Sequence, residues 1–250
     1  MRWLPIAIFL FILMSLFIYS PVFAEVQPEE LLINTYEADI TGDGQNETIE
    51  LIGVLFSQET KYYREVWADI SSVHGGQWKI PYEGGYEPSL QFIDLNQDQI
   101  TDIFYQSSTG GSGGLYNYHL HYLENEKLKE LQLPEQRFIK GSFKDNFKVS
   151  IHVSPDKDPV ELNVKDRAGE YLRLELYDKQ GNLLKPTSVM IDPIAFFEPL
   201  LISKSKGYGL KSYQQISGAY HADRLGTVET LWYYENEEWI ILQTEWVSSS

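Results

Sequence analysis

The sequence predicts an all-β protein built from antiparallel sheets, with little helix. Apolar and polar residues alternate along several segments, and a period of two places one face of a strand on the core and the other toward water. Short clusters rich in Gly, Asn, Asp and Pro separate these segments, which is typical of hairpins. Aromatic residues, which favour strands, make up 14% of the chain. The alternating segments are residues 48–52, 116–122, 148–153, 171–177 and 229–234.

The first 24 residues are predicted to be a signal peptide. Arg2 is the only charged residue before Glu25, residues 3–19 are almost wholly apolar, and Ala24 ends a cleavage pattern of small residues. We expect cleavage after Ala24. Retention as a membrane anchor is the alternative, because about 17 apolar residues approach the length that spans a bilayer. Residues 25–250 are then expected to be secreted or extracytoplasmic, in the cell envelope, and to form a single domain, because no charge run or long polar linker divides them. A membrane is an expected partner only if the first segment stays uncleaved.

Helix is expected to be a minor component. Only residues 28–34 and 194–203 have a helical pattern, and Pro199 would interrupt the second. The clearest hairpin joins residues 171–177 to residues 183–184 through Asp-Lys-Gln-Gly-Asn.

Composition and motifs exclude several classes of function. The chain has 20 Lys and Arg against 36 Asp and Glu, a formal net charge of −16, so a nucleic acid partner is not expected. It has no Cys, which excludes disulfides, thiolate zinc sites and cysteine nucleophiles. No nucleophile elbow or His-Glu-x-x-His motif is present, and we expect no enzyme. Ser217, His221 and Asp223 lie close in sequence, but in a loop that enters a strand they are expected to form a turn.

Two other patterns have ordinary structural interpretations. His119 and His121 would face the same side of a strand, which could hold a transition metal, but no third ligand is identifiable and cross-strand pairing is expected. The Gly-rich residues 110–114 are not followed by Gly-Lys-Ser/Thr, so a flexible connection is expected rather than a phosphate loop.

An internal repeat sets the expected architecture. Residues 38–49 align without gaps on residues 93–104, which is an offset of 55 residues. This period is close to the roughly 40 to 50 residues of a four-stranded propeller blade. We therefore expect a propeller-like or partial-propeller array of about four repeat units. The good repeats lie near residues 38–92 and 93–141, and degenerate units follow after residue 142.

Both good repeats carry a pattern of oxygen donors that suits calcium. Calcium takes six to eight oxygen ligands, and a tight loop supplies them when donors fall at every second position. Three carboxylates packed in one turn would also repel one another unless a cation lies among them. Plain turn chemistry is the alternative, because Asp, Asn and Gly bond to their own backbone without a metal. The predicted ligands are Asp39, Thr41, Asp43, the Gln45 carbonyl and Glu47 in the first loop, and Asp94, Asn96, Asp98, the Ile100 carbonyl and Asp102 in the second.

These loops differ from the helical calcium hand and resemble another family. The helical hand needs Glu at position 12, where the second loop has Tyr105, and in both loops the residues that follow alternate as strand. The sequence instead resembles the FG-GAP or VCBS repeat, whose Asp-x-Asn-x-Asp-Gly-x-x-Asp loops join two strands of a propeller blade, as in integrin alpha subunits and many secreted bacterial proteins. The resemblance covers residues 38–49 and 93–104, with departures at Thr41, Glu47 and Gln99. It implies a divergent member of this family with calcium as the cofactor.

Three functions from different classes follow from these expectations. The leading one is a secreted, calcium-stabilised binding or scaffold protein of the cell envelope or extracellular space, with an extracellular protein or polysaccharide as partner. The second is a carbohydrate-binding module or carbohydrate-active enzyme, since aromatic rings stack on sugars, although such rings also fill cores. The third is a purely structural extracytoplasmic protein. The candidate stacking residues are Tyr62, Tyr63, Trp67, Trp78, Tyr82, Tyr86, Trp232 and Trp239.

Overall fold

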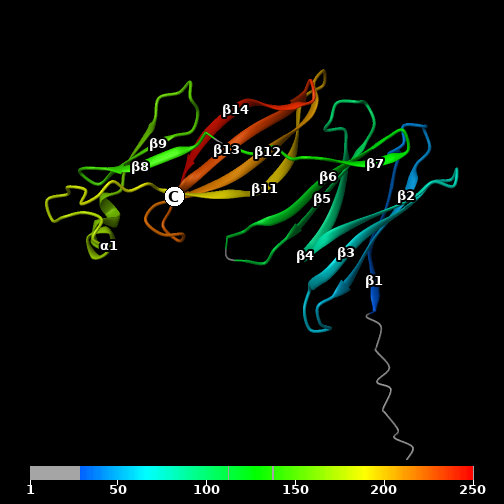
Figure 1. Cartoon of the computed structure of the whole chain (residues 1–250), viewed down its shortest axis with the longest axis horizontal. Helices are drawn as coiled ribbons and strands as arrows, with labels where there is room; N and C mark the ends of the chain where they lie inside the picture. Colours follow the sequence, from blue (N-terminus) through cyan, green and yellow to red (C-terminus); the bar gives the residue numbers. More distant parts are fainter. Residues whose placement is uncertain (1–28, 112, 137, 250) are drawn as a thin grey trace, which may run out of the picture.

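A computed structural model of the chain describes residues 29–111, 113–136 and 138–249, which form three antiparallel sheets and little helix (Figure 1). The predicted class, all-β with antiparallel sheets, is therefore confirmed. The predicted signal peptide, residues 1–24, lies outside the described residues. Within the described ranges, no helix combines the length and the apolar character needed to cross a membrane.

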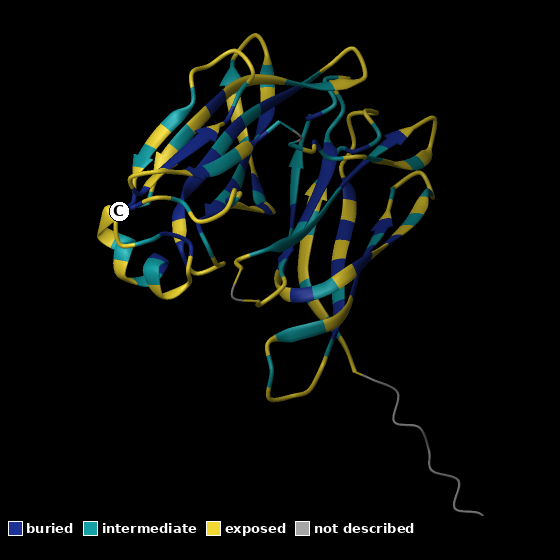
Figure 2. Ribbon diagram, turned by 60° about the vertical axis from the view of Figure 1, so that its left-hand side comes forward, coloured by how far each residue is buried: buried dark blue, intermediate teal, exposed yellow. Residues whose placement is uncertain are grey.

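The first sheet is a meander of seven strands that pair in sequence order. Hairpins connect the strands, and buried and exposed residues alternate along them (Figure 2). In the second strand, for example, Ile49 and Leu51 are buried while Thr48 and Glu50 are exposed. The strands are β1 (Glu30–Ala38), β2 (Glu47–Leu55), β3 (Tyr62–Ser71), β4 (Gln77–Ile93), β5 (Asp102–Ser108), β6 (Tyr116–Glu124) and β7 (Lys127–Leu131).

This sheet is strongly curved and encloses a core on one face. Tyr36 of β1 contacts Phe92 of β4, with 5.3 Å between ring centroids, although three strand pairings separate β1 from β4. The Tyr36 hydroxyl also accepts the backbone N–H of Leu90 at 3.3 Å. Curvature therefore brings non-neighbouring strands together around one apolar cluster. Its buried members are Ile40, Ile49, Leu51, Val66, Ala68, Ile70, Ile80, Tyr82, Leu90, Ile103, Tyr105 and Leu123.

The rest of the chain forms two smaller sheets and a short helical segment. A three-stranded sheet contains β8 (Lys140–Lys144), β9 (Lys148–His152) and β10 (Val160–Asn163). The helical segment consists of η1 (Lys165–Arg167) and α1 (Ala168–Arg173). A four-stranded sheet contains β11 (Met190–Ser203), β12 (Gly207–Ser217), β13 (Arg224–Glu235) and β14 (Glu238–Ser248).

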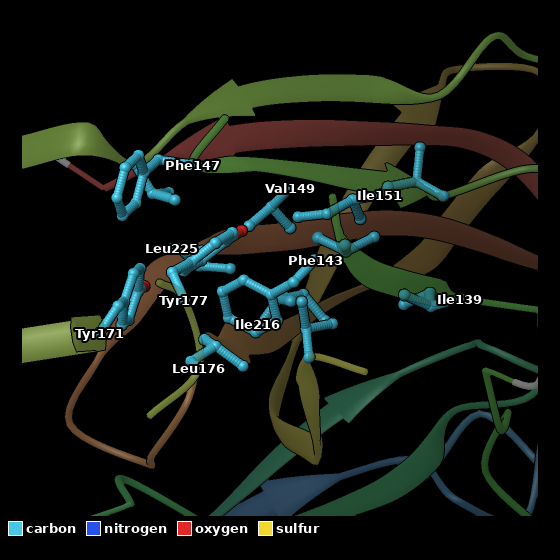
Figure 3. Close-up of a cluster of buried hydrophobic side chains, with 14 residues drawn as sticks. Ile139, Phe143, Phe147, Val149, Ile151, Tyr171, Leu176, Tyr177, Ile216 and Leu225 are labelled. Atoms are coloured by element: carbon cyan, nitrogen blue, oxygen red, sulfur yellow. The ribbon is translucent and has the colours of Figure 1, made fainter. Parts of the chain in front are cut away.

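The two smaller sheets and α1 share one core (Figure 3). Phe143 and Val149 from the three-stranded sheet pack with Tyr171 of α1 and with Ile216 and Val228 of the four-stranded sheet. All five side chains are at most 2% exposed. The two smaller sheets and α1 therefore depend on one another, because each contributes buried side chains to the same core.

A third cluster joins the seven-stranded sheet to the four-stranded sheet. Its buried residues come from both parts of the chain, and they include Phe104 of β5, Leu120 of β6, Phe197 of β11 and Trp232 of β13. Tyr118 of β6 meets the Phe197 ring edge-to-face, with 4.8 Å between ring centroids. The large sheet and the C-terminal sheets are thus connected by packed apolar side chains as well as by the chain itself.

Two local expectations from sequence are wrong. Residues 171–177, expected as a hairpin strand, begin inside α1, and only a single bridge links Tyr177 to Leu183. The alternation was misleading because Ala168, Tyr171 and Leu172 also fall at helical spacing, and all three pack on the shared core. The segments expected as helix, residues 28–34 from residue 30 onward and residues 194–203, are strand instead. Pro199 is tolerated there in β11, at an edge of its sheet.

Candidate functional site

The first candidate loop, residues 39–47, joins β1 to β2 and is closed by its own side chains. The Asp39 carboxylate accepts the backbone N–H groups of Gly42 at 2.7 Å and Gly44 at 2.9 Å. The Asp43 carboxylate accepts the N–H of Gln45 at 2.7 Å. These bonds wind the backbone around the acidic side chains.

Glu47 completes the first loop from inside the protein. Its side chain is fully buried, accepts the Ile40 N–H at 3.0 Å and receives a longer hydrogen bond from the Thr41 hydroxyl at 3.4 Å. The acid at the ninth position therefore ties the start of the loop to the start of β2.

The second candidate loop, residues 94–102, joins β4 to β5 with the same bonds. The Asp94 carboxylate accepts the N–H groups of Gln97 at 2.8 Å and Gln99 at 3.0 Å, and Asp98 accepts that of Ile100 at 2.8 Å. Asn96 is another predicted ligand of this loop. Its side-chain amide donates to the Asp98 carboxylate and accepts the Asp98 backbone N–H, each at 2.9 Å.

Asp102 is the buried acid of the second loop. Its side chain accepts the N–H groups of Leu95 at 2.8 Å and Asn96 at 3.0 Å, and the residue is 1% exposed. Burial raises the pKa of Asp102 to about 7 against the effect of these bonds, and the negative charges of Asp98 and Asp94 raise it further. The carboxyl group thus lies in an environment that lacks compensating positive charge.

The backbone of the two loops matches as closely as the hydrogen bonds. The fourth and sixth positions have positive φ in both, 73° and 85° at Gly42 and Gly44, and 67° and 72° at Gln97 and Gln99. Glycine adopts this conformation freely, whereas glutamine does so at a cost. The second loop keeps the geometry without the glycines, so the repeat seen in the sequence is also a repeat of local structure.

The two loops lie against each other at one end of the sheet. A Cβ atom added at Gly42 would lie 3.0 Å from Cγ1 of Ile100, so the two loops are in tight contact there, and the positive φ of Gly42 also favours glycine. The second loop also reaches the other half of the molecule, because the Gln97 side-chain amide donates to the backbone carbonyl of Tyr208 in β12 at 2.8 Å. The structure therefore places the two loops side by side, with the second loop at the junction of the two halves.

The arrangement of these oxygens bears on both interpretations of the loops. They satisfy backbone N–H groups, as plain turn chemistry requires. Among the described residues, no three His, Asp or Glu side chains are placed so that they could hold a metal ion. The donor chemistry nevertheless suits a hard cation, because a carboxylate or amide oxygen can accept more than one partner. Calcium binding stays a prediction.

Sequence reasoning missed a histidine bridge on the curved sheet. The His119 ring lies between two carboxylates, with Nδ1 2.6 Å from Glu130 of β7 and Nε2 2.5 Å from Glu83 of β4. Burial would lower the pKa of His119, but the hydrogen bonds to Glu130 and Glu83 outweigh burial and raise it. Nothing in the sequence marks these two glutamates, because only the sheet register brings them to His119.

His121, two residues away, has the opposite environment. It is 8% exposed, and its Nδ1 atom has no hydrogen-bond partner among the described residues. Burial lowers the pKa of His121 to about 4, so the ring is neutral at pH 7. The two histidines do face the same side, with ring centroids 5.9 Å apart, as the strand period predicts.

Ser217, His221 and Asp223 do not form a catalytic relay. The Ser217 hydroxyl donates to the backbone carbonyl of His221 at 3.0 Å, and the His221 ring lies 3.0 Å from Asp192. Asp223 is paired instead with Arg167, at 2.6 Å. These contacts fit the turn-forming role expected from the sequence.

Most of the aromatic residues proposed for sugar stacking have structural roles. Trp67, Tyr82 and Trp232 are buried, while Tyr62, Tyr63, Trp78 and Trp239 are half-buried and Tyr86 is exposed. Trp78 and Trp239 each donate the indole N–H to a backbone carbonyl, at 3.0 and 2.9 Å. Core filling therefore accounts for more of this set than an exposed stacking platform does.

Comparisons with known proteins identify relatives without assigning a function. Residues 137–247 match the family model described as the YybI C-terminal domain. The chain is also similar to the Bacillus subtilis (strain 168) protein named "Uncharacterized protein YybI", with 28% identity over 221 residues that cover 84% of this chain and 82% of that protein. The family match covers the C-terminal sheets, whereas this relative also extends into the seven-stranded sheet.

Two solved structures show a weaker likeness. They are Bacillus licheniformis rhamnogalacturonan lyase PL11 and the exotype rhamnogalacturonan lyase YesX, each with 14% identity and a TM-score of 0.37. The similarity covers 87% of this chain but only 34% and 33% of theirs, so the chain spans about a third of those proteins. A likeness at this level says nothing about what this chain does.

Proposed function

We propose that this chain is a secreted or extracytoplasmic binding protein whose two matching loops bind calcium and thereby stabilise the fold. The observation that carries the proposal is the shared geometry of residues 39–47 and 94–102, including positive φ at Gln97 and Gln99 where glycine would be unstrained. Burial and nearby negative charges disfavour the ionised form of Asp102 and raise its pKa, and a bound cation would stabilise that ionised form. A cation there would offset the repulsion that Asp94 and Asp98 exert on it.

The proposed calcium sites have a clear structural task. The second loop contacts Tyr208 through Gln97, and the first packs on Ile100 of the second. Calcium would therefore rigidify the junction between the seven-stranded and four-stranded sheets. The alternative is a purely structural protein, in which calcium stabilises the fold and no partner binds.

A pocket beside the first loop supports the binding part of the proposal. It has a volume of about 670 Å³, and its walls include Thr41 and Asp43 of the loop together with His74 and Trp78. A pocket of this size accommodates a small ligand or part of a larger one. An extracellular polysaccharide or protein is the proposed partner, and glycan-array binding of residues 25–250 with and without calcium would separate a sugar-binding role from a structural one.

The propeller-like arrangement is a proposal of the same kind. Its support is the shared β-loop-β unit, because the two good repeats supply the hairpins β1–β2 and β4–β5. Both hairpins belong to one curved sheet rather than to separate blades.

Calorimetric titration of residues 25–250 with calcium tests the proposed function. Calcium at about a hundred times its dissociation constant would stabilise the fold by about 2.7 kcal/mol if the unfolded chain does not bind it. We expect Asp98→Ala to abolish most of this stabilisation and Asp43→Ala to reduce it less, because Thr41 makes the first loop the poorer site. Asp156→Ala, an exposed acid outside both loops, is the control. Absence of binding heat, together with equal melting curves in calcium and in chelator, would reduce both loops to ordinary turns.

A further inference from the structure

A polar pocket lies where α1, the loop between β12 and β13, and the end of β14 meet. Figure 1 shows the end of the chain next to that loop. The pocket has a volume of about 580 Å³, within the range of small-ligand sites. The two candidate calcium loops contribute no residue to it. The residues that line it are Arg167, Glu170, Tyr171, Tyr220, Ala222, Asp223, Arg224, Ser248 and Ser249.

The buried acid of this pocket is fully engaged. The side chain of Asp223 is 4% exposed and accepts hydrogen bonds from Arg167 Nη1 at 2.6 Å, the Tyr171 hydroxyl at 2.7 Å and the Ala219 N–H at 2.8 Å. Arg167 also donates from Nη2 to the backbone carbonyl of Arg224 at 3.0 Å. The positive charge of Arg167 therefore compensates the negative charge of Asp223, and Asp223 holds the Arg167 guanidinium in a fixed position.

Arginine is concentrated at this pocket although the protein as a whole is acidic. The described residues contain four arginines, and all but Arg64 belong here: Arg167 and Arg224 line the pocket, and Arg173 pairs with the lining residue Glu170. The formal net charge of the chain is −16. The charged side chains that line the pocket balance, two arginines against Glu170 and Asp223, so an anionic ligand meets less repulsion here than the net charge of the chain implies.

Arg224 is available for a ligand. It is exposed, it donates to the Thr227 hydroxyl at 2.7 Å, and among the described residues no carboxylate lies within ion-pair distance of it. A guanidinium group presents several N–H donors in a planar fork that matches the oxygens of a carboxylate or a phosphate. The exposed ring of Tyr220 forms an adjacent wall of the pocket.

We propose that this pocket binds a small ligand or chain end that carries a carboxylate or phosphate group, with Arg224 as the principal contact and Arg167 as a second, pre-positioned donor. Tyr220 packs beside the ligand, and the Arg167–Asp223–Tyr171 network keeps the pocket in shape. The site is distinct from the candidate calcium loops, so it does not depend on a metal.

Titration in calcium-free buffer tests this site separately from the calcium proposal. The probes are inorganic phosphate and glucuronate, with glucose as the uncharged control. We expect at least one anion to bind, glucose not to bind, and the affinity to fall as sodium chloride is added. Binding of phosphate alone, or of glucuronate alone, would identify the preferred group.

Substitutions at matched arginines decide the assignment. Arg224→Gln should weaken anion binding by about tenfold or more, because a charge-assisted hydrogen bond is lost. Arg224→Lys, which keeps the charge but not the fork, should retain part of the affinity. Arg64→Gln, an exposed arginine on β3, should bind like the original protein. The proposal is overturned if neither anion binds, if glucose binds as well as glucuronate, or if Arg224→Gln binds as tightly as the original protein.

Discussion

At the residue scale, neighbouring histidines have opposite charge preferences because different strands surround them. His119 is held between Glu83 of β4 and Glu130 of β7, and its pKa is raised. His121 is more deeply buried on the same strand, with its ring in an edge-to-face contact with Tyr82 at a centroid distance of 5.8 Å, and burial lowers its pKa to about 4. The sequence spacing is the same for both, and burial and partners decide the difference.

This contrast predicts how stability changes in acid. His121 is neutral in the folded protein, whereas the unfolded chain binds a proton below about pH 6.5. The free energy of unfolding should therefore fall as the pH is lowered from about 6.5 toward 4. His121→Leu, which removes the titrating ring and its unpaired nitrogen, should reduce that fall by on the order of 1 kcal/mol. Urea unfolding at pH 7 and pH 4.5 measures it.

Val73, 69% exposed on the connection between β3 and β4, supplies the control for this measurement. Val73→Leu changes no titrating group and should leave the acid-induced fall unchanged. For His119 the sign is reversed: its contribution is complete below about pH 6.5 and is lost as the pH rises through its raised pKa. An identical pH profile for His121→Leu and the original protein would show that this ring does not titrate as its burial implies.

At the element scale, α1 is held in place by apolar contacts with the core and by one buried side-chain hydrogen bond. Ala168, Tyr171 and Leu172 pack on the shared core, and the Tyr171 hydroxyl donates to Asp223 at 2.7 Å. A helix of six residues has little stability of its own, so these contacts must supply it.

Removing the hydrogen bond between Tyr171 and Asp223 should destabilise α1 without changing the fold. Tyr171→Phe keeps the buried ring but deprives Asp223 of one of its three donors, so we expect a loss of about 1–3 kcal/mol in the free energy of unfolding. Tyr220→Phe, in the same pocket but 41% exposed, should cost much less. Denaturant unfolding of both variants gives the comparison, and equal losses would show that the Asp223 bond contributes nothing specific.

At the scale of the whole molecule, one apolar seam joins the two halves. Phe104 and Leu120 of the large sheet pack with Phe197 and Trp232 of the four-stranded sheet, and the Gln97–Tyr208 hydrogen bond lies at the same junction. Large buried side chains at such a seam contribute both hydrophobic transfer and packing. We therefore expect the whole protein to unfold in one cooperative transition.

Phe197→Ala tests the seam. The ring is 2% exposed, so truncation should cost about 3–5 kcal/mol and separate the calorimetric transition into two. Phe56→Ala, at a ring that is 69% exposed, should change neither the stability nor the number of transitions. A single, unshifted transition in Phe197→Ala would show that this ring does not couple the two halves.

The amino-acid sequence alone determined the strand class and the local form of the two loops. Period-two alternation predicts four of the five strand segments because sheet faces differ in burial, and the Asp-rich spacing predicts turns because these side chains bond to their own nearby backbone. Only the tertiary structure decided which residues meet across strands. Glu83 and Glu130 reach His119, Gly42 meets Ile100, and Asp223 collects Arg167 and Tyr171, through contacts between residues distant in sequence. The tertiary structure also decided that residues 168–173 are helical. Residues near this segment fit both the strand period and the helix period, and the core on which they pack selects the helix.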